Sequence, residues 1–258
     1  MAEADDEDAR RGRPRTHVAR MRIAGHAVRY ETTGAGPPVI LVHGLGGSAR
    51  WWRTTTAALA GDHRVIVPEL PGFGYGVGVP PFRLPDAIAV LRRLIERLRL
   101  ERPALVGHSL GALVCLGVAA ASPEAVGRLV LISPPVRTAS PRMAGNVIPM
   151  VRTLMGLSPG AALTVMSDVA TRAPDALVGA AEEILAHEGE PGIADEPPVP
   201  TLVVLGARDA VVPIEGAGWI AQSLPGARIV VIPGAGHVPM LDRPEALDAE
   251  LRRFLAAS

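Results

Sequence analysis

Two serines stand at the centre of a Gly-x-Ser-x-Gly segment, a spacing in which a serine hydroxyl can act as a nucleophile. Ser109, in residues 107–111, lies between a predicted strand and a predicted helix, where flanking glycines allow the sharp turn that projects the hydroxyl. Ser158 follows a helical stretch and precedes Pro159, which has no N–H to offer an oxyanion. We therefore predict Ser109 as the nucleophile and Ser158 as a turn residue and helix cap.

A serine nucleophile needs a base that takes its proton and a carboxylate that orients the base. Of the seven histidines, His237 stands in a glycine-rich loop directly after the last predicted strand, and Asp209 follows the strand before it. Ser109, Asp209 and His237 occur in the order expected for successive strand ends of one sheet, which predicts a catalytic triad. His108 is expected to point elsewhere, and Asp168 belongs to an inserted segment.

A second glycine-rich segment, residues 43–48, follows the predicted strand 38–42. Glycines allow a backbone to approach a ligand closely and to turn an N–H toward it. We assign the backbone N–H groups of Leu45 and Leu110 to an oxyanion hole. A phosphate-binding loop is not supported, because no lysine follows the glycines and no acid is placed for a ribose.

Apolar side chains near these loops are candidates for the walls of a substrate pocket. Two tryptophans follow the glycine-rich segment, and for either one helix packing is the competing role. Methionines of the inserted segment have the flexibility to line an apolar cavity. The candidates are Trp51, Trp52, Met150, Met155 and Val211.

Short apolar runs alternate with helical stretches through most of the chain, which predicts an α/β protein with an eight-stranded, mostly parallel sheet flanked by helices. The first two strands are expected to form an antiparallel hairpin. The predicted strands are 17–23, 27–32, 38–42, 64–68, 104–107, 129–132, 201–206 and 228–232, and the helices 50–59, 84–98, 110–121, 214–223 and 244–256.

The alternation breaks once, in residues 134–198, where three short helices near 142–157, 161–169 and 174–187 replace strands. This insertion is either a small helical cap over one end of the sheet or an ordinary helical excursion, and the position of the triad favours the cap. The expected layout is a mobile charged tail (1–16), a core (17–133 and 199–258) and the cap (134–198).

Composition narrows the classes of function. The 26 basic and 26 acidic residues cancel, and only three Trp, three Phe and two Tyr occur, which argues against nucleic acid or a membrane as partner. The single cysteine, Cys115, offers neither a disulfide nor a metal site and is expected in the core. We expect a cytoplasmic protein, since the N-terminus lacks a signal-peptide pattern. We also expect that the protein uses no metal or cofactor. The oligomeric state is left open.

These segments resemble those of the α/β-hydrolase fold family, over residues 18–258. Residues 41–48 resemble its oxyanion loop, 107–111 its nucleophile elbow, 205–209 its acid loop and 234–237 its histidine loop. Residues 68–76 resemble a further family loop, with Glu69 where Asp is usual and Gly76 where Ser is common. The resemblance implies a helical cap between strands six and seven, and Ser109 argues against the branches that use Asp as nucleophile.

The leading expectation is a capped serine esterase that cleaves small neutral carboxylic esters with small to medium aliphatic acyl groups through an acyl-enzyme. One alternative is hydrolysis of a carbon–carbon bond in a vinylogous diketone. Another is a slow-turnover ligand-binding or signalling protein on the same fold, because a fold does not choose among these activities.

Overall fold

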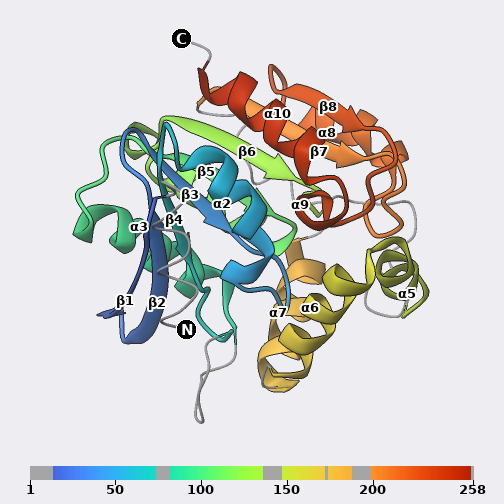
Figure 1. The fold of residues 1–258 in the computed structure, drawn as a ribbon, viewed down its shortest axis with the longest axis horizontal. Helices are drawn as coiled ribbons and strands as arrows, with labels where there is room; N and C mark the ends of the chain where they lie inside the picture. The colour runs from blue at the N-terminus through green and yellow to red at the C-terminus, as the bar shows by residue number, and fades with distance from the viewer. Residues whose placement is uncertain (1–13, 74–81, 136–146, 172–173, 188–198, 257–258) are drawn as a thin grey trace.

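The computed structural model describes residues 14–73, 82–135, 147–171, 174–187 and 199–256, which surround one central sheet (Figure 1). The sheet has eight strands in the spatial order β1-β2-β4-β3-β5-β6-β7-β8. Strand β2 pairs antiparallel with β1 and with β4, and all other neighbours are parallel, so the predicted sheet is confirmed. The strands are β1 (Thr16–Ile23), β2 (His26–Thr33), β3 (Pro38–Val42), β4 (Arg64–Pro68), β5 (Ala104–His108), β6 (Arg128–Ile132), β7 (Thr201–Gly206) and β8 (Arg228–Ile232).

Helices connect the strands much as predicted, with four differences, one of which is the short helix η2, absent from the predicted set. The predicted helix 50–59 divides into η1 and α2, the predicted helix 214–223 divides into η3 and α8, and the four-residue helix α9 is too short to show a period in the sequence. The helices are η1 (Ala49–Trp52), α2 (Arg53–Leu59), α3 (Leu84–Arg97), α4 (Leu110–Ala121), η2 (Pro123–Ala125), α5 (Val147–Gly156), α6 (Pro159–Ala170), α7 (Pro174–His187), η3 (Ile214–Gly216), α8 (Ala217–Ser223), α9 (Pro239–Asp242) and α10 (Pro244–Ala256).

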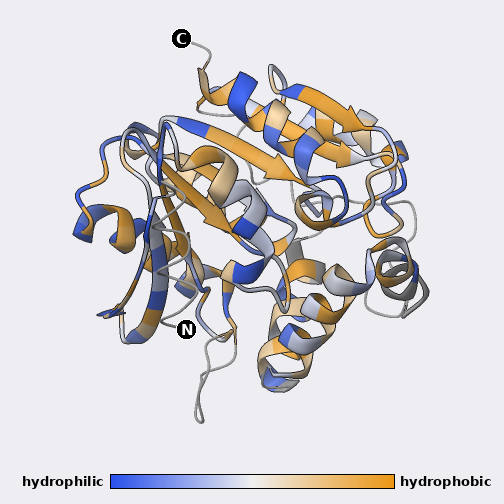
Figure 2. Cartoon of the chain, viewed as in Figure 1, coloured by the Kyte–Doolittle hydropathy of each residue, from blue (hydrophilic) through white to orange (hydrophobic). Residues whose placement is uncertain are grey.

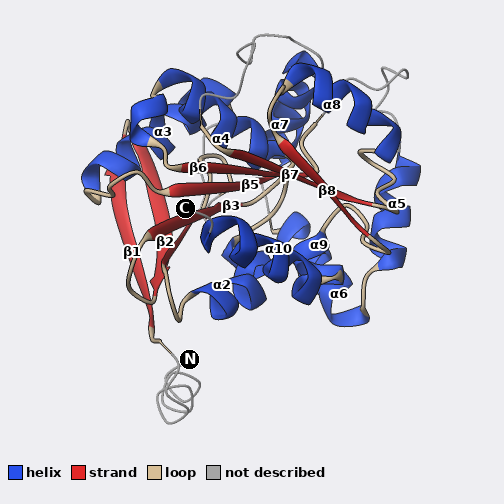
Figure 3. Ribbon diagram, turned by 90° about the horizontal axis from the view of Figure 1, so that it is seen from above, coloured by secondary structure: helices blue, strands red, loops and turns tan. Residues whose placement is uncertain are grey.

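The sheet is covered on both faces, by α3, α4 and α8 on one side and by α2, α9 and α10 on the other (Figure 3). Alternate residues of a central strand therefore enter different cores. In β6, Leu129 and Leu131 join the first core, whereas Val130 and Ile132 join the second. Burial on both faces explains why the central strands are continuous apolar runs, which appear mainly orange in Figure 2.

The two outer strands differ from this pattern. Strand β1 has mostly exposed or half-exposed residues, as expected of an edge strand in a hairpin. The apolar sequence of β8 is typical of a strand buried on both faces, but Val231 is 36% exposed, because β8 forms the other edge of the sheet. Its apolar sequence alone does not distinguish an edge strand from a central one.

Helix α4 contains Cys115, which is fully buried in the first core, as predicted. Burial raises the pKa of this thiol, so the side chain acts as a small apolar residue. Among the described helices, none combines the length and the apolar character needed to cross a membrane.

The helices of the inserted segment, α5, α6 and α7, lie together at one end of the molecule (Figure 1). Helix α7 adds Ala180 and Ile184 to the first core, and α6 adds Val165 to the second. A Cβ atom at Gly46 would lie 2.9 Å from Val169 of α6 and 3.5 Å from Leu177 of α7. The described part of the insertion therefore sits against the glycine-rich segment that follows β3.

Candidate active site

The predicted nucleophile, Ser109, occupies a sharp turn between β5 and α4. Its backbone has φ 50° and ψ −117°, a left-handed conformation that is strained for a residue with a Cβ atom. The Ser109 N–H donates to the carbonyl of Ile132 at 2.9 Å, which ties the turn to β6. The residue is 6% exposed and directly precedes the first turn of α4, where helix N–H groups lack intrahelical partners.

The glycines around Ser109 allow three backbone segments to meet. A Cβ atom at Gly107 would collide with the carbonyl of Gly111. A Cβ atom at Gly111 would lie 2.5 Å from the carbonyl oxygen of Val42 and 2.6 Å from that of His43. The spacing thus serves close contact between the start of α4 and the end of β3, in addition to the turn itself.

Replacement of Gly111 with alanine is expected to lower the free energy of unfolding by about 3 kcal/mol, because the new methyl group meets backbone atoms that cannot rotate away. The midpoint of urea unfolding measures the change. Gly156→Ala is the matched control: no atom lies within 4 Å of a Cβ there, so its unfolding free energy should change by less than about 1 kcal/mol. Equal midpoints for both variants would contradict the steric argument.

Asp209 and His237 meet beside this turn, at the ends of β7 and β8. His237 Nδ1 lies 2.9 Å from Asp209 Oδ2 and 3.2 Å from Oδ1. The backbone N–H groups of Val211 and Val212 both donate to Asp209 Oδ1 at 2.8 Å. Because an ionised carboxylate only accepts, His237 carries its proton on Nδ1 and leaves Nε2 with a lone pair.

The charge on Asp209 is favoured by its surroundings. Burial by itself raises the pKa of this carboxyl, but the neighbouring His237 and the hydrogen bonds from His237 and Val212 outweigh burial and hold the pKa below its ordinary value. Asp209 is 6% exposed and His237 is 7% exposed. The arrangement keeps a carboxylate and an oriented imidazole together in a nearly dry environment.

His108 was expected to point away from the site, and that expectation is wrong. Its Nε2 lies 2.8 Å from the carbonyl oxygen of His237, so this nitrogen donates and holds the backbone of the histidine loop. The two rings lie 4.9 Å apart, centroid to centroid. Burial and the nearby His237 lower the pKa of His108 to about 3, and the ring is therefore neutral in ordinary buffers.

Asp242, in α9, also supports the histidine loop and was missed by the sequence analysis. Its Oδ2 accepts a hydrogen bond from the Gly236 N–H at 2.6 Å, one residue before His237. Burial raises the pKa of this carboxyl, against the opposing effect of that hydrogen bond. The signal was Pro239 with an acid three residues later, a pattern that favours the first turn of a helix.

The glycine-rich segment after β3 forms a tight turn, closed by a hydrogen bond from the Gly47 N–H to the Gly44 carbonyl at 3.1 Å. Gly46, the third residue of this turn, has φ 68°, a backbone conformation that glycine adopts readily. Among the described residues, the N–H groups of Leu45 and Leu110 donate to no other backbone group. Both are therefore available for an oxyanion, the role predicted for them.

The side chain of His43 ties this turn to the loop that follows β4. Its Nε2 accepts a hydrogen bond from the Leu70 N–H at 3.1 Å, so the ring proton is on Nδ1, which lies 2.8 Å from the Gly44 carbonyl. The adjacent Glu69, in the loop where the resembled family usually has Asp, is buried and contacts Arg29 at 3.2 Å. Gly76, in the same loop, lies outside the described residues.

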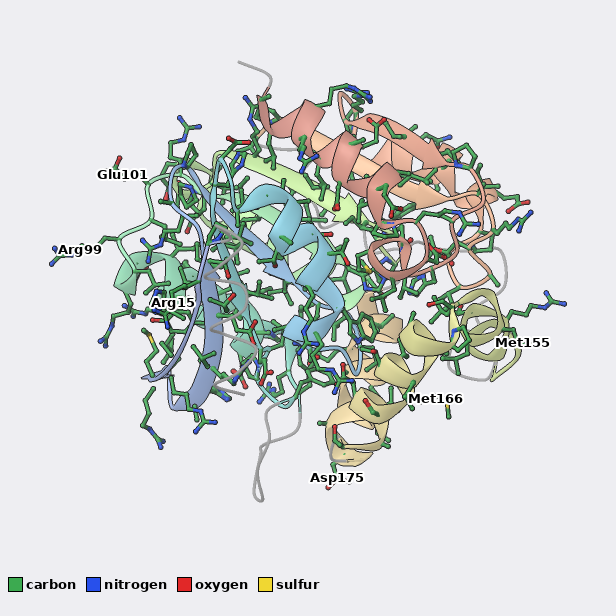
Figure 4. All side chains as sticks on the ribbon, viewed as in Figure 1. Arg15, Arg99, Glu101, Met155, Met166 and Asp175 are labelled. Carbon is green, nitrogen blue, oxygen red and sulfur yellow. The ribbon has the colours of Figure 1, made fainter. Side chains whose placement is uncertain are left out.

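The structure does not bring the tryptophans and Met155 to an open pocket. Trp51 is 4% exposed and donates its Nε1–H to Asp168 at 2.9 Å, and Trp52 is fully buried in the second core. Met155 is 81% exposed and extends outward from α5, as Figure 4 shows. These expectations fail because the tryptophans belong to η1, which packs inward, and Met155 lies on the outer side of its helix.

The remaining pocket candidates are differently placed. Val211 is half-buried against the first core, directly beside Asp209. The side chain of Met150 lies outside the described residues. Met166, another methionine of the insertion, is 57% exposed and also faces outward (Figure 4). The described methionines therefore do not form the flexible apolar lining that the sequence suggested.

Ser158 has the role predicted for it. It precedes α6 as its N-terminal cap, with its side-chain oxygen accepting from the Ala161 N–H at 3.3 Å. The residue is exposed and lies in the inserted segment. Its glycine neighbour Gly160 has open space around it, unlike Gly107 and Gly111.

The chemistry offered by the site is nucleophilic and acid–base. A serine in a strained turn, an imidazole oriented by a carboxylate, and two unused backbone donors are the groups needed for acyl transfer. In the parts of the chain that the structure describes, no three His, Cys, Asp or Glu side chains gather closely enough to hold a metal ion.

Comparison with known proteins identifies the family. A model described as the alpha/beta hydrolase family matches residues 39–250, which include the elbow, the acid loop and the histidine loop. This chain belongs to the alpha/beta hydrolase family. The resemblance inferred from the four segments is thereby confirmed.

Relatives within the family include esterases. The chain is 31% identical to a pimeloyl-[acyl-carrier protein] methyl ester esterase of Aromatoleum aromaticum, over 81% of this chain and 94% of the relative. The structure of the present chain resembles that of a thermophilic esterase of Thermogutta terrifontis (TM-score 0.78, 25% identity, 93% and 98% of the two chains). It also resembles a serine hydrolase involved in carbazole degradation (TM-score 0.78, 26% identity, 93% and 99%).

Proposed function

We propose that this alpha/beta hydrolase cleaves carboxylic esters of small to medium aliphatic acyl groups, with Ser109 as nucleophile, His237 as base and Asp209 as the orienting acid. The observation that carries the proposal is the Asp209 carboxylate. Two backbone N–H groups hold one of its oxygens, and His237 Nδ1 lies 2.9 Å from the other, so the neutral imidazole keeps its lone pair on Nε2, the atom that would take the serine proton.

Acylation follows from this arrangement. His237 Nε2 takes the proton of the Ser109 hydroxyl as the oxygen attacks the ester carbonyl, and the carbonyl π electrons move to oxygen. The N–H groups of Leu45 and Leu110 stabilise the oxyanion, each typically by a few kcal/mol. The oxyanion then collapses, the carbon–oxygen bond to the alcohol breaks, and His237 gives its proton to the departing alkoxide.

Deacylation repeats these steps with water as nucleophile. His237 removes a proton from water, the hydroxide oxygen attacks the acyl carbon, and the same two donors hold the second oxyanion. The bond to Ser109 breaks as His237 returns the proton to the serine oxygen. The acid product leaves and the enzyme is regenerated.

Several observations support an apolar, neutral ester as substrate. Leu45, Leu177 and Val211 are partly buried apolar residues packed against the first core. Leu177 lies next to Gly46 of the glycine-rich turn, and the Val211 N–H donates to Asp209. The chain has no net charge with which to favour a charged substrate. The relative from Aromatoleum aromaticum is named as a methyl ester esterase. We place the protein in the cytoplasm as part of this proposal, since its single cysteine offers no disulfide.

The test is a panel of nitrophenyl esters of increasing acyl length, combined with a fluorophosphonate label located by mass spectrometry. We expect multiple turnover of acyl chains of about two to eight carbons, since each buried methylene adds about 0.8 kcal/mol of binding until the pocket is filled. The label should be found on Ser109. Turnover of a vinylogous diketone with inert esters would instead assign carbon–carbon hydrolysis, and binding without multiple turnover would assign a signalling role.

A further inference from the structure

Helix α6 of the insertion buries a charged residue and exposes apolar ones, the reverse of the usual distribution. Its single charged residue, Asp168, is completely buried, whereas its exposed positions include Leu163, Met166 and Val169, at 68%, 57% and 40% exposure. A surface helix of a globular protein normally buries its apolar stripe and exposes its charges. The buried carboxylate is therefore the feature of α6 that needs a physical reason.

The Asp168 carboxylate accepts two hydrogen bonds, one from the last residue of the oxyanion loop and one from η1. The Ser48 hydroxyl donates to Oδ2 at 2.7 Å, and Trp51 Nε1–H donates to the same oxygen at 2.9 Å. Arg50 Nη1 lies 3.6 Å from the other oxygen, Oδ1, which has no hydrogen-bond partner among the described residues. Arg50 also donates to Ser167 Oγ of α6 at 2.6 Å.

The residues that contact helix α6 also contact the oxyanion loop, or the histidine that holds the His237 loop. Ser48 ends the glycine-rich segment and caps η1, since its hydroxyl oxygen accepts from the Arg50 N–H at 3.2 Å. The Trp51 ring lies 5.8 Å from the ring of His108, which in turn donates to the carbonyl of His237. Val169, adjacent to Asp168, rests against Gly46, the residue after the predicted oxyanion donor Leu45.

The cost of burial argues against a role in stability alone. A carboxylate removed from water loses solvation that a half-exposed arginine at 3.6 Å restores only in part, and an apolar residue of similar volume would often be as stable. Unlike an apolar side chain, a carboxylate forms directional hydrogen bonds, and these fix the positions of the groups that donate to it. The groups fixed here are Ser48 and Trp51.

We propose that Asp168 is a positioning residue that latches helix α6 onto the end of the oxyanion loop, so that the insertion takes part in holding the oxyanion donor and the histidine loop in place. The proposal rests on the proposed ester hydrolysis and goes beyond it. Asp168 touches neither the nucleophile nor the base, and it acts through Ser48, Trp51 and their neighbours.

The test compares Asp168→Ala, Asp168→Asn and Trp51→Phe with wild type, using a nitrophenyl ester and the rate of fluorophosphonate labelling. Asp168→Ala removes the acceptor and should lower kcat about 10- to 100-fold with KM within about 2-fold, because the oxyanion donors lose their alignment. Trp51→Phe keeps an aromatic ring, a smaller one, but removes the indole N–H donor, and kcat should fall about 3- to 10-fold. Asp168→Asn retains an acceptor oxygen and should restore kcat to within about 5-fold of wild type.

Asp175→Ala is the matched control, since Asp175 is an exposed carboxylate of the same insertion, at its outer tip in Figure 4. It should leave kcat unchanged. A structural role alone predicts a lower unfolding midpoint with normal kcat per labelled serine, and that result would overturn the proposal. If Asp168→Ala does not fold, Trp51→Phe is the variant that tests the proposal. An unchanged kcat and an unchanged labelling rate in Trp51→Phe would then overturn the proposal. If the fluorophosphonate labels wild-type Ser109 but the protein hydrolyses no ester, the proposed function is wrong. The labelling rates of the variants then test the positioning role of Asp168 by themselves.

Discussion

Ser109→Ala is expected to lower kcat for ester hydrolysis by about 10⁵-fold or more, because it removes the hydroxyl proposed to form the acyl-enzyme and leaves only the oxyanion donors. The variant should fold, since alanine is no larger than serine and the turn is held by the backbone hydrogen bond to Ile132. Initial rates with a nitrophenyl ester, corrected for buffer hydrolysis, measure the effect. Fluorophosphonate labelling should disappear in parallel.

The control for this prediction is Ser158→Ala, because both serines have the Gly-x-Ser-x-Gly spacing. Ser158 caps α6, so its loss should cost about 1 kcal/mol of stability and leave kcat unchanged. Retention of activity in Ser109→Ala, or loss of labelling in Ser158→Ala, would refute the assignment of the nucleophile.

Asp209→Asn is expected to lower kcat by about 10⁴-fold while the fold is retained. The N–H groups of Val211 and Val212 both point at Oδ1, so the amide oxygen must take that position and the amide NH₂ must face His237. An NH₂ donates, so His237 must then accept at Nδ1 and carry its proton on Nε2, where it cannot take the serine proton. The variant should therefore retain KM and lose kcat.

The difference in stability between wild type and Asp209→Asn should depend on pH in a defined direction. The folded-state pKa of Asp209 is lowered, so the stabilisation from its charge is fully present above the unfolded pKa of about 3.9 and is lost as pH falls through the folded value. The difference in unfolding free energy between wild type and variant should thus be constant near neutral pH and shrink below about pH 4. Urea unfolding at several pH values measures it, and a difference that grows on acidification would contradict the assigned hydrogen bonds.

Much of the fold could be predicted because its signals are local. The central strands are apolar runs of five or six residues, and their ends coincide with the predicted ones or differ from them by one residue. Edge position is not local: β8 has the composition of a buried strand, but its neighbours in space decide that Val231 stays exposed. Short 3₁₀ and α-helical turns escaped prediction because they lack a full period.

The candidate site divides in the same way. Ser109, Asp209 and His237 were proposed from strand ends and chain order, since parallel strands bring their carboxyl ends to one edge of a sheet. Trp51, by contrast, was proposed for a pocket because it follows the oxyanion loop in sequence. Its indole instead donates to a carboxylate 117 residues away, a contact that no sequence spacing indicates.

The sequence by itself therefore determined the family, the sheet, and the identity of the three residues proposed for catalysis, because each depends on residue types at short, regular spacings. Only the tertiary structure decided which side chains support them. His108 meets the carbonyl of His237 across 129 residues, and Asp168 meets Ser48 across 120. Such contacts depend on how the insertion and the loops dock on the sheet, and the free energy of docking is spread over many residues that carry no common motif.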